Sequence, residues 1–114
     1  MTRLKINLQN LMIYRIVCKD LNIKPVYIGS TTDFTNRKYD HKSSCENVDG
    51  KKYNYELYQF IRNNGGWANW DMVLIENYAC NSKLESLRQG RIWYEFYYPT
   101  GIINSHMPLA DRTL

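Results

Sequence analysis

Three side chains that could act together on a phosphodiester bond stand close to one another in this chain. Tyr27 opens the segment Tyr27-Ile28-Gly29, and Arg37 and His41 follow on a predicted helix. Because these last two residues are four positions apart, the helix would place them on the same side. Hydrolysis of a phosphodiester needs an activated water, stabilisation of the charge on the phosphate and help for the departing oxygen. A phenol, a guanidinium and an imidazole suit these three tasks.

Each side chain fits a different part of this reaction. A tyrosine can orient or deprotonate water, but only about one unperturbed phenol in a thousand is ionised at neutral pH, so Arg37 or a metal would have to lower its pKa. The guanidinium of Arg37 matches the nonbridging oxygens of a phosphate and stays charged. His41 can relay a proton or hold a tyrosine in place. Taken singly such residues are usually structural, but their joint spacing favours the functional interpretation.

Two strands are predicted ahead of this helix. Residues 11–18 are apolar enough for a buried strand with Tyr14 and Ile16 on one face. After a polar turn, residues 26–29 form a second strand. An antiparallel hairpin of these strands would bring Tyr14 and Tyr27 onto one face of a sheet.

The connection from the second strand to the helix depends on a glycine. The missing side chain of Gly29 would let the chain turn sharply at the end of the strand. Thr32 is the predicted N-cap of the helix, and Asp33 in the first turn is favourable against the helix dipole. We expect the helix to run to about Ser44 and to be followed by a polar loop over residues 46–53.

The remaining elements complete a small α+β fold. Apolar residues at helical spacing predict a second helix over residues 55–64, which ends at a Gly-Gly pair. Residues 71–77 read as a third strand. Ser82 and Glu85 form a capping box that opens a helix running to about Tyr97. The predicted fold is a three-stranded antiparallel sheet flanked by three helices, in the order β-β-α-α-β-α.

The composition indicates one intracellular domain covering residues 1–114. The chain is 44% apolar and 23% charged, which is ordinary for a globular domain of this size. It contains no apolar run long enough to span a membrane and no signal-peptide stretch, so we expect a protein that stays inside a cell and does not act at a membrane. The net charge of +4 favours a polyanionic partner.

The cysteines do not form a recognisable metal or disulfide pattern. Cys18, Cys45 and Cys80 are widely spaced, and we expect free, buried thiols in a reducing compartment. His41 and Cys45 are four residues apart and could share a metal. Because His106 is the other histidine of the chain, a structural zinc site is not expected.

The chain resembles the GIY-YIG endonuclease family over nearly its whole length, from about residue 11 to residue 108. Residues 12–14 (Met-Ile-Tyr) match the first half of the family motif, with Met where the family usually has Gly, and residues 27–29 (Tyr-Ile-Gly) match the second half. Residues 52–67 resemble stand-alone members found in large DNA viruses and other mobile elements. Both half-motifs with the downstream residues at the family's spacing make the resemblance specific.

The resemblance implies a DNA endonuclease that hydrolyses phosphodiester bonds with Mg²⁺ or Mn²⁺. Its implied site residues are Tyr14, Tyr27, Arg37, His41 and Asn104. The tyrosines would position or activate the water, Arg37 would clamp the scissile phosphate, His41 would support a tyrosine and Asn104 would brace the site. DNA would be bound through its phosphate backbone, and a homodimer or a second protein could supply the specificity.

One position departs from the family pattern. The last helix of the family carries a metal-binding Glu three residues before an aromatic such as Trp93, and this position is Gly90 here. Glycine in a helix interior costs about 1 kcal/mol relative to Ala. Glu85 and Glu95 are each five positions away, about 140° around the helix, so neither replaces the missing carboxylate. We therefore expect an aligned metal position without a ligand and heavily impaired catalysis.

A non-catalytic nucleic-acid-binding module of the same fold is the alternative. Its backbone contacts would come from Arg37, Lys38, Lys42, Lys51 and Lys52. Trp67, Trp70 or tyrosines could stack on bases, although we favour a structural role for the tryptophan pair, anchoring the second helix to the sheet. A protein-interaction domain that does not bind nucleic acid is a third option.

Overall fold

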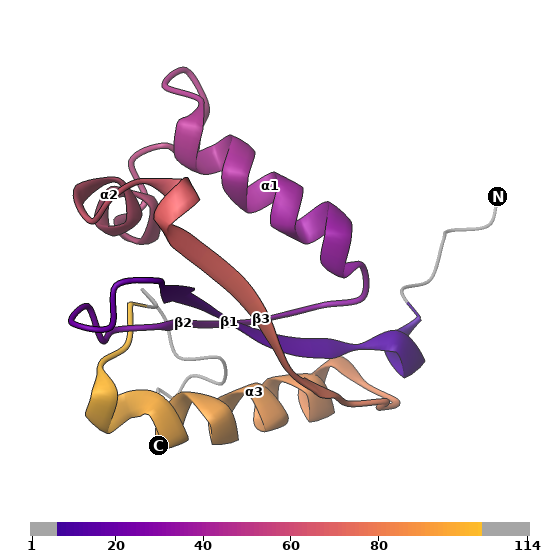
Figure 1. Cartoon of the computed structure of the whole chain (residues 1–114). Coiled ribbons are helices and arrows are strands. Elements are labelled where there is room, and N and C mark those ends of the chain that lie inside the picture. The colour runs from indigo at the N-terminus through magenta and orange to yellow at the C-terminus, as the bar shows by residue number, and fades with distance from the viewer. Residues whose placement is uncertain (1–6, 104–114) are drawn as a thin grey trace, which may run out of the picture.

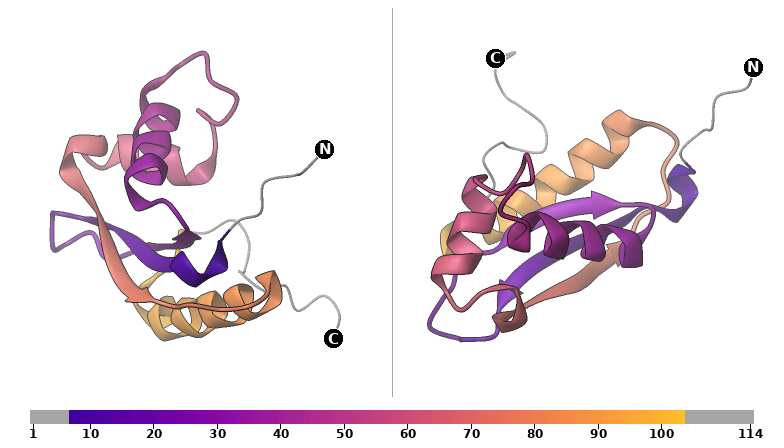
Figure 2. Two further views of the ribbon diagram at one scale, coloured as in Figure 1. Left: turned by 90° about the vertical axis from the view of Figure 1, so that its right-hand side faces the viewer. Right: turned by 90° about the horizontal axis from the view of Figure 1, so that it is seen from above.

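The computed structural model describes residues 7–103 and has the predicted α+β architecture. Within these residues, three antiparallel strands form one sheet in the order β2-β1-β3, so β2 and β3 are its edges. Helices α1 and α2 cover one face of the sheet and α3 covers the other (Figures 1 and 2). The elements are β1 (Met12–Cys18), β2 (Tyr27–Thr31), α1 (Phe34–Glu46), α2 (Glu56–Asn63), β3 (Trp70–Asn77) and α3 (Lys83–Tyr97), with short 3₁₀ turns at Leu8–Asn10, Trp67–Asn69 and Tyr98–Thr100.

The β1–β2 hairpin places the two predicted tyrosines side by side. Tyr14 pairs with Gly29, Ile16 pairs with Tyr27, and the ring centroids of the tyrosines are 6.3 Å apart. Because alternate residues of a strand point to opposite faces, Tyr14 and Ile16 pack with α1 and α2, whereas Ile13 packs on the other side. The predicted hairpin and the shared face of the tyrosines are confirmed.

Two apolar clusters, one on each face of the sheet, join it to the helices. The first lies on the side of α1 and α2 and includes Tyr14, Ile16, Cys45, Tyr58, Ile61, Trp67 and Trp70. The second includes Ile13, Val26 and Ile28, with Trp93 and Tyr97 of α3 packed against them. Strand β1 contributes to both clusters and is the central strand, so it is the most thoroughly buried element of the sheet.

Gly29 does not end the second strand, contrary to the prediction. Strand β2 continues for two further residues, both paired with β1, and the φ of Gly29 is not positive. Its missing side chain serves a different purpose, because a Cβ at this position would collide with the hydroxyl of Tyr14 and lie 2.9 Å from Cε1 of Tyr27. Glycine is required here by the close approach of two aromatic rings to the strand.

Helix α1 is capped by Asp33 and not, as predicted, by Thr32. The backbone of Asp33 is extended, and its carboxylate accepts a hydrogen bond from the N–H of Asn36 at 3.1 Å. Because β2 is longer than predicted, the helix begins later, and it runs to Glu46 rather than to Ser44.

The predicted ends of the other helices agree with the structure. Gly65 and Gly66 follow α2 with φ values of 100° and 79°, a region that favours glycine. Ser82 caps α3 by accepting a hydrogen bond from the N–H of Glu85 at 3.1 Å. The carboxylate of Glu85 in turn accepts from the N–H of Asn81 at 2.6 Å, one residue earlier than in the usual capping box.

The predicted free thiols are also confirmed. Cys18, Cys45 and Cys80 are buried and form no disulfide. None of the helices within residues 7–103 combines the length and the apolar character that crossing a bilayer requires.

We expect Gly29→Ala to destabilise the protein by about 1–3 kcal/mol, because the added methyl group overpacks the space held by the Tyr14 ring. Urea unfolding followed by circular dichroism measures this change. Ser30→Ala, at the exposed neighbouring position of β2, is the control and should change stability by less than about 0.5 kcal/mol.

A second variant connects the loss to the clash itself. Tyr14→Leu removes both atoms of Tyr14 that the new Cβ would meet, the hydroxyl oxygen and Cζ of the ring, so Gly29→Ala should cost less stability in the Tyr14→Leu background than in the wild type. Equal costs in both backgrounds would contradict this account of Gly29.

Candidate active site

Four of the five predicted site residues converge on the face of the sheet that α1 covers. The ring of His41 lies 5.8 Å from that of Tyr14 and 5.7 Å from that of Tyr27, measured between centroids. Arg37, one turn earlier on α1, interacts with the hydroxyls of both tyrosines. Asn104, the fifth predicted residue, lies outside the described residues. The central geometric expectation, that two phenols and a guanidinium share one site, agrees with the structure.

His41 is fully buried and joins two tyrosines through its two ring nitrogens. Its Nε2 lies 2.7 Å from the hydroxyl of Tyr14, and its Nδ1 lies 2.8 Å from the hydroxyl of Tyr58 on α2. The ring of Trp67 stacks against the imidazole at 6.3 Å. A side chain enclosed in this way cannot touch a substrate, so the geometry favours the second of the two uses considered for His41, holding a tyrosine in place.

Tyr58 was not predicted as a site residue. The sequence places it on the buried face of α2 but does not reveal what its hydroxyl binds. A signal was nevertheless present, because a buried tyrosine usually needs a hydrogen-bond partner and so does a buried histidine. Burial raises the pKa of the Tyr58 hydroxyl to about 12, even though a hydrogen bond from Ser44 opposes the shift.

The imidazole of His41 is neutral at physiological pH. Burial, reinforced by the positive charges of Arg37 and Lys52, lowers the pKa of His41 to about 3. A neutral imidazole has one N–H, so one ring nitrogen donates a hydrogen bond and the other accepts one. The hydroxyls of Tyr14 and Tyr58 must therefore act in opposite senses, one as acceptor and one as donor.

The tyrosines are less acidic than expected. Burial raises the pKa of Tyr14 above its usual value, and Tyr27 adds to the effect, whereas Arg37 opposes it. Burial likewise raises the pKa of Tyr27 in spite of Arg37. Arg37 acts in the required direction, but it does not by itself make either phenol acidic, because desolvation is the larger effect. Both phenols are neutral hydrogen-bonding groups in this state.

Arg37 remains the charged group of the cluster. Burial alone would lower its pKa, but the nearby hydroxyls of Tyr14 and Tyr27 outweigh burial and raise it. Arg37 and Tyr27 are partly exposed, whereas Tyr14 and His41 are fully buried behind them. A substrate approaching this face would therefore meet the guanidinium and the Tyr27 hydroxyl first.

A comparison with protein families agrees with this arrangement. The model of the GIY-YIG catalytic domain matches residues 10–97. The chain belongs to the GIY-YIG family. Membership places it in a family of nucleases, which are generally dependent on a divalent metal. No curated protein and no solved structure shows significant similarity to the chain.

The described part of this GIY-YIG domain does not offer a fitting site for a divalent cation. Within residues 7–103, no group of three or more His, Cys, Asp or Glu side chains could hold a metal. No carboxylate contributes to the pKa shifts of Tyr14, Tyr27, Arg37 or His41. The electrostatics of the cluster are therefore cationic, whereas magnesium sites are built from oxygen ligands that carry negative charge.

Gly90 lies buried in the middle of α3, the helix that contacts β2 and covers the face of the sheet opposite α1 (Figure 1). Its φ is not positive and α3 continues for seven residues, to Tyr97, so neither backbone strain nor a helix end requires glycine. The neighbouring carboxylates are engaged elsewhere, since Glu85 caps the helix and Glu95 pairs with Arg91 at 2.8 Å. Within the described residues of α3, neither Glu85 nor Glu95 is placed to supply the carboxylate that is missing at position 90.

The tryptophans have the structural role that the sequence favoured. Trp67 is 9% exposed and Trp70 3% exposed, too little for either ring to stack on a base. The indole N–H of Trp70 donates to the carbonyl of Asn64 at 3.1 Å, which joins the end of α2 to β3. The suggestion that this pair stacks on nucleic-acid bases is therefore wrong.

The stability of the domain should fall at mildly acidic pH because of His41. Its pKa is about 3 in the folded state and 6.5 in the reference state, so between these values the unfolded chain binds the extra proton. The contribution of His41 to the free energy of unfolding is fully present above pH 6.5, the pKa of His41 in the unfolded chain. Below this pH the contribution decreases by up to about 1.4 kcal/mol per pH unit. Urea unfolding near neutral pH and near pH 5 should differ by about 2 kcal/mol from His41 alone.

His41→Gln isolates this contribution, since glutamine keeps a donor and an acceptor but does not titrate. The variant should be less stable at neutral pH and should show a smaller loss on acidification than the wild type. The same loss in both proteins would mean that His41 is not held neutral by the fold.

Proposed function

We propose that this GIY-YIG domain is built to hydrolyse DNA phosphodiester bonds, and that this chain does so poorly because Gly90 occupies the aligned metal-ligand position. The observation that carries the proposal is the placement of Arg37 against the hydroxyls of Tyr14 and Tyr27 on a partly exposed face. A guanidinium held by two neutral hydroxyls keeps its full charge for an anion. Among residues 7–103, no carboxylate contributes to the pKa shift of Arg37.

The exposure of the site residues divides their roles. Arg37 clamps the nonbridging oxygens of the scissile phosphate and stabilises the charge that grows on them. The neutral hydroxyl of Tyr27 hydrogen-bonds the attacking water and orients it toward phosphorus. Tyr14 lies behind and fixes the guanidinium, and Asn104 braces the site as the family resemblance implies.

His41 acts through Tyr14. The low pKa of the imidazole makes the protonated ring costly, so His41 is a poor reservoir for a proton from water. Its two short hydrogen bonds instead hold the Tyr14 hydroxyl in one orientation. In this proposal His41 is a positioning residue.

An active form of this domain would use Mg²⁺ or Mn²⁺. A divalent ion in a nuclease site stabilises charge on the phosphate and on the departing oxygen. The missing carboxylate at position 90 is the reason to expect weak metal binding and impaired cleavage. The likeness of residues 52–67 to stand-alone viral and mobile-element members supports a role inside a cell, with target choice supplied by a homodimer or a second protein.

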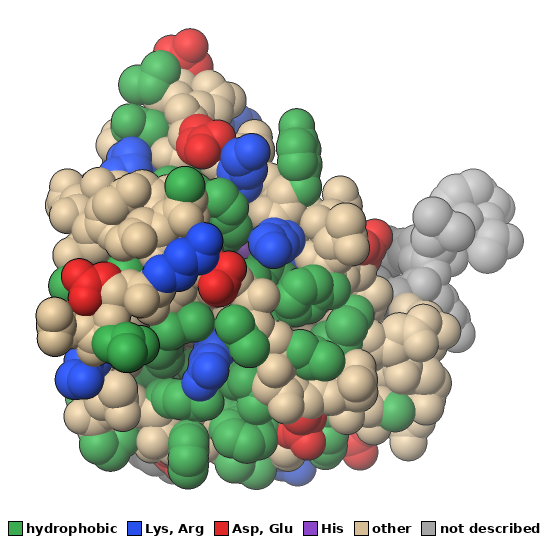
Figure 3. Space-filling view, viewed as in Figure 1, with side chains coloured by type: hydrophobic (Ala, Val, Ile, Leu, Met, Phe, Trp, Pro, Cys, Tyr) green, Lys and Arg blue, Asp and Glu red, His purple; other side chains and the backbone are tan. Residues whose placement is uncertain are grey.

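A non-catalytic nucleic-acid-binding module remains the second candidate. It is supported by the same missing carboxylate and by exposed basic side chains on α1 and the following loop, which are Lys38, Lys42, Lys51 and Lys52. Figure 3 shows basic side chains spread over the half of the molecule formed by α1 and α2. Salt-sensitive DNA binding without cleavage, even with Glu at position 90, would favour this module over the nuclease.

Gly90→Glu should increase metal-dependent nicking of plasmid DNA by about 100-fold or more, because a bound metal contributes several kcal/mol to the transition state. Gly90→Gln is the matched control, since it adds nearly the same volume without the charge and should give no gain. Thermal unfolding of both variants tests whether the buried helix accepts a side chain. A folded Glu variant without increased nicking would contradict the assignment of position 90.

Arg37→Ala in the Gly90→Glu background should reduce nicking by about 10²–10³-fold, as expected for the loss of a donor to the developing charge. Arg37→Lys should recover little of this activity, because an ammonium does not reproduce the bidentate contact. Lys83→Ala on α3 is the control for charge alone. Unchanged nicking in both Arg37 variants would remove the phosphate clamp from the proposal.

A further inference from the structure

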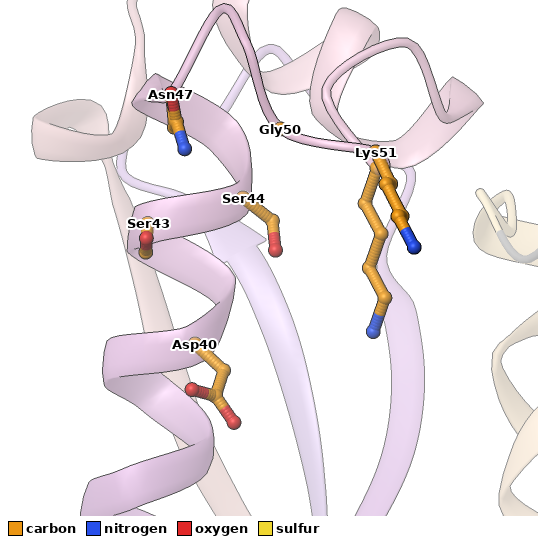
Figure 4. Close-up of a pocket in the computed structure, with 7 residues that line it drawn as sticks. Asp40, Ser43, Ser44, Asn47, Gly50 and Lys51 are labelled. Atoms are coloured by element: carbon orange, nitrogen blue, oxygen red, sulfur yellow. The ribbon is translucent and has the colours of Figure 1, made fainter.

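A hollow of about 430 Å³ lies beside the cluster, between α1 and the loop that follows it (Figure 4). Asp40, Ser44 and Asn47 line it from the helix and its C-cap, and Lys51 and Lys52 line it from the loop. Figure 4 shows the side chains of Asp40 and Ser44 directed from α1 toward the segment that carries Lys51. The function proposed above makes no use of this hollow.

Hydrogen bonds link the lining of the hollow to the candidate active site. The hydroxyl of Ser44 hydrogen-bonds Tyr58, which in turn contacts His41. Arg37, His41 and Ser44 are spaced by four and three residues and so share one face of α1. From Arg37 to Ser44 the helix rises by about 10 Å. A strand bound at Arg37 and running along α1 would therefore pass over the hollow.

The loop that carries the lysines is held in place by Arg62. The guanidinium of Arg62 donates to the carbonyl of Cys45 at 2.8 Å and to the carbonyl of Tyr53 at 2.7 Å, thereby joining both ends of the loop to α2. It also lies 3.6 Å above the ring of Tyr53. The lysines are thus mounted on a fixed segment rather than on a freely moving one.

The charges of the two lysines are not neutralised by an ion pair. In the part of the chain that the structure describes, the ion pair present joins Arg91 and Glu95 on α3. Asp40 faces the hollow, but no ion pair joins it to Lys51 or Lys52. The lining therefore carries two positive charges and one negative charge, together with the amide of Asn47 and nearby hydroxyls.

We propose that this hollow binds a backbone phosphate of the nucleic-acid strand that Arg37 engages, about one or two nucleotides from the scissile phosphate. This inference rests on the proposed function, which supplies the contact between Arg37 and the scissile phosphate. The spacing follows from the rise of about 10 Å along α1, because neighbouring phosphates of one strand lie farther apart than the axial rise of about 3.4 Å per nucleotide. The two ammonium groups attract the phosphate, and Asp40 weakens the attraction so that the strand can leave.

The test measures binding of a short mixed-sequence DNA duplex by fluorescence anisotropy, without divalent metal, so that cleavage plays no part. The double variant Lys51→Ala/Lys52→Ala should bind about tenfold more weakly, with a salt dependence reduced by about one phosphate contact. Asp40→Asn should bind about two- to threefold more tightly, because it removes a like charge. Unfolding curves check that each variant is folded.

A charge-matched control separates the hollow from net charge. Lys83→Ala/Arg88→Ala removes two exposed positive charges from α3, on the other face of the sheet, and should change affinity by less than about twofold. Equal losses in the two double variants would overturn the proposal. Weaker binding by Asp40→Asn would also overturn it, since the carboxylate would then be a ligand rather than a repelling charge.

Neutral methylphosphonates, introduced one at a time along the duplex, locate the contact. The lysine double variant should become insensitive to substitution at one phosphate, and Arg37→Ala should become insensitive to substitution at another phosphate about one or two nucleotides away. If Arg37→Ala removes the effect of a methylphosphonate at one position but the lysine double variant does so at none, the hollow is not a phosphate site and the proposed function stands. If neither variant removes the effect of any methylphosphonate, the result counts against both the proposed function and the phosphate site in the hollow.

Discussion

The buried imidazole of His41 is the interaction on which the rest of the site depends. Through two short hydrogen bonds it joins Tyr14 of β1 to Tyr58 of α2, while its own backbone belongs to α1. Removing either partner would leave a buried polar atom unsatisfied, at a cost of about 1–3 kcal/mol. The strand and the two helices therefore cannot shift independently, and the position of Arg37 relative to Tyr27 follows from this constraint.

The same burial that fixes the geometry makes most of these side chains poor acids and bases. It raises the pKa values of the tyrosines and lowers that of His41, so all of them are neutral at physiological pH. Arg37 alone keeps a charge, because the hydroxyls around it favour the charged form. Such a cluster is suited to orienting a water and holding an anion, and it relies on preorganisation rather than on strong proton transfer.

Because the cluster around Arg37 supplies positive charge and neutral hydroxyls, the proposed function needs a metal-binding carboxylate from elsewhere, and position 90 is where the family resemblance puts it. The face formed by α1 and the following loop carries exposed positive charge. On α3, by contrast, the available acidic side chains cap the helix or pair with arginine. The chain thus retains the groups that attract a polyanion, whereas Gly90 supplies no group that would attract a cation. In the proposed function, the charges that would attract DNA and the carboxylate that would bind a metal belong to different elements, so one can be lost while the other is kept.

Much of the architecture is determined by local sequence signals. Alternating and helical apolar spacings predict three strands and three helices in the observed order, and the Ser82–Glu85 box and the glycines after α2 mark helix ends, because each of these signals acts over a few residues. The placement of Tyr14 and Tyr27 on one face of the hairpin also follows, since a hairpin leaves few registers that bury both apolar faces. The resemblance to the GIY-YIG family, carried by short motifs, led to the same fold.

Tertiary structure alone decided the features that depend on packing between distant segments. The need for glycine at position 29 comes from the Tyr14 ring on a neighbouring strand, and the role of Tyr58 comes from a histidine on another helix. The direction of the phenol pKa shifts was also beyond the sequence, because it is set by how completely the rings are desolvated. A sequence shows which groups are present and how far apart they lie along the chain, whereas burial and close contact arise only once the layers pack together.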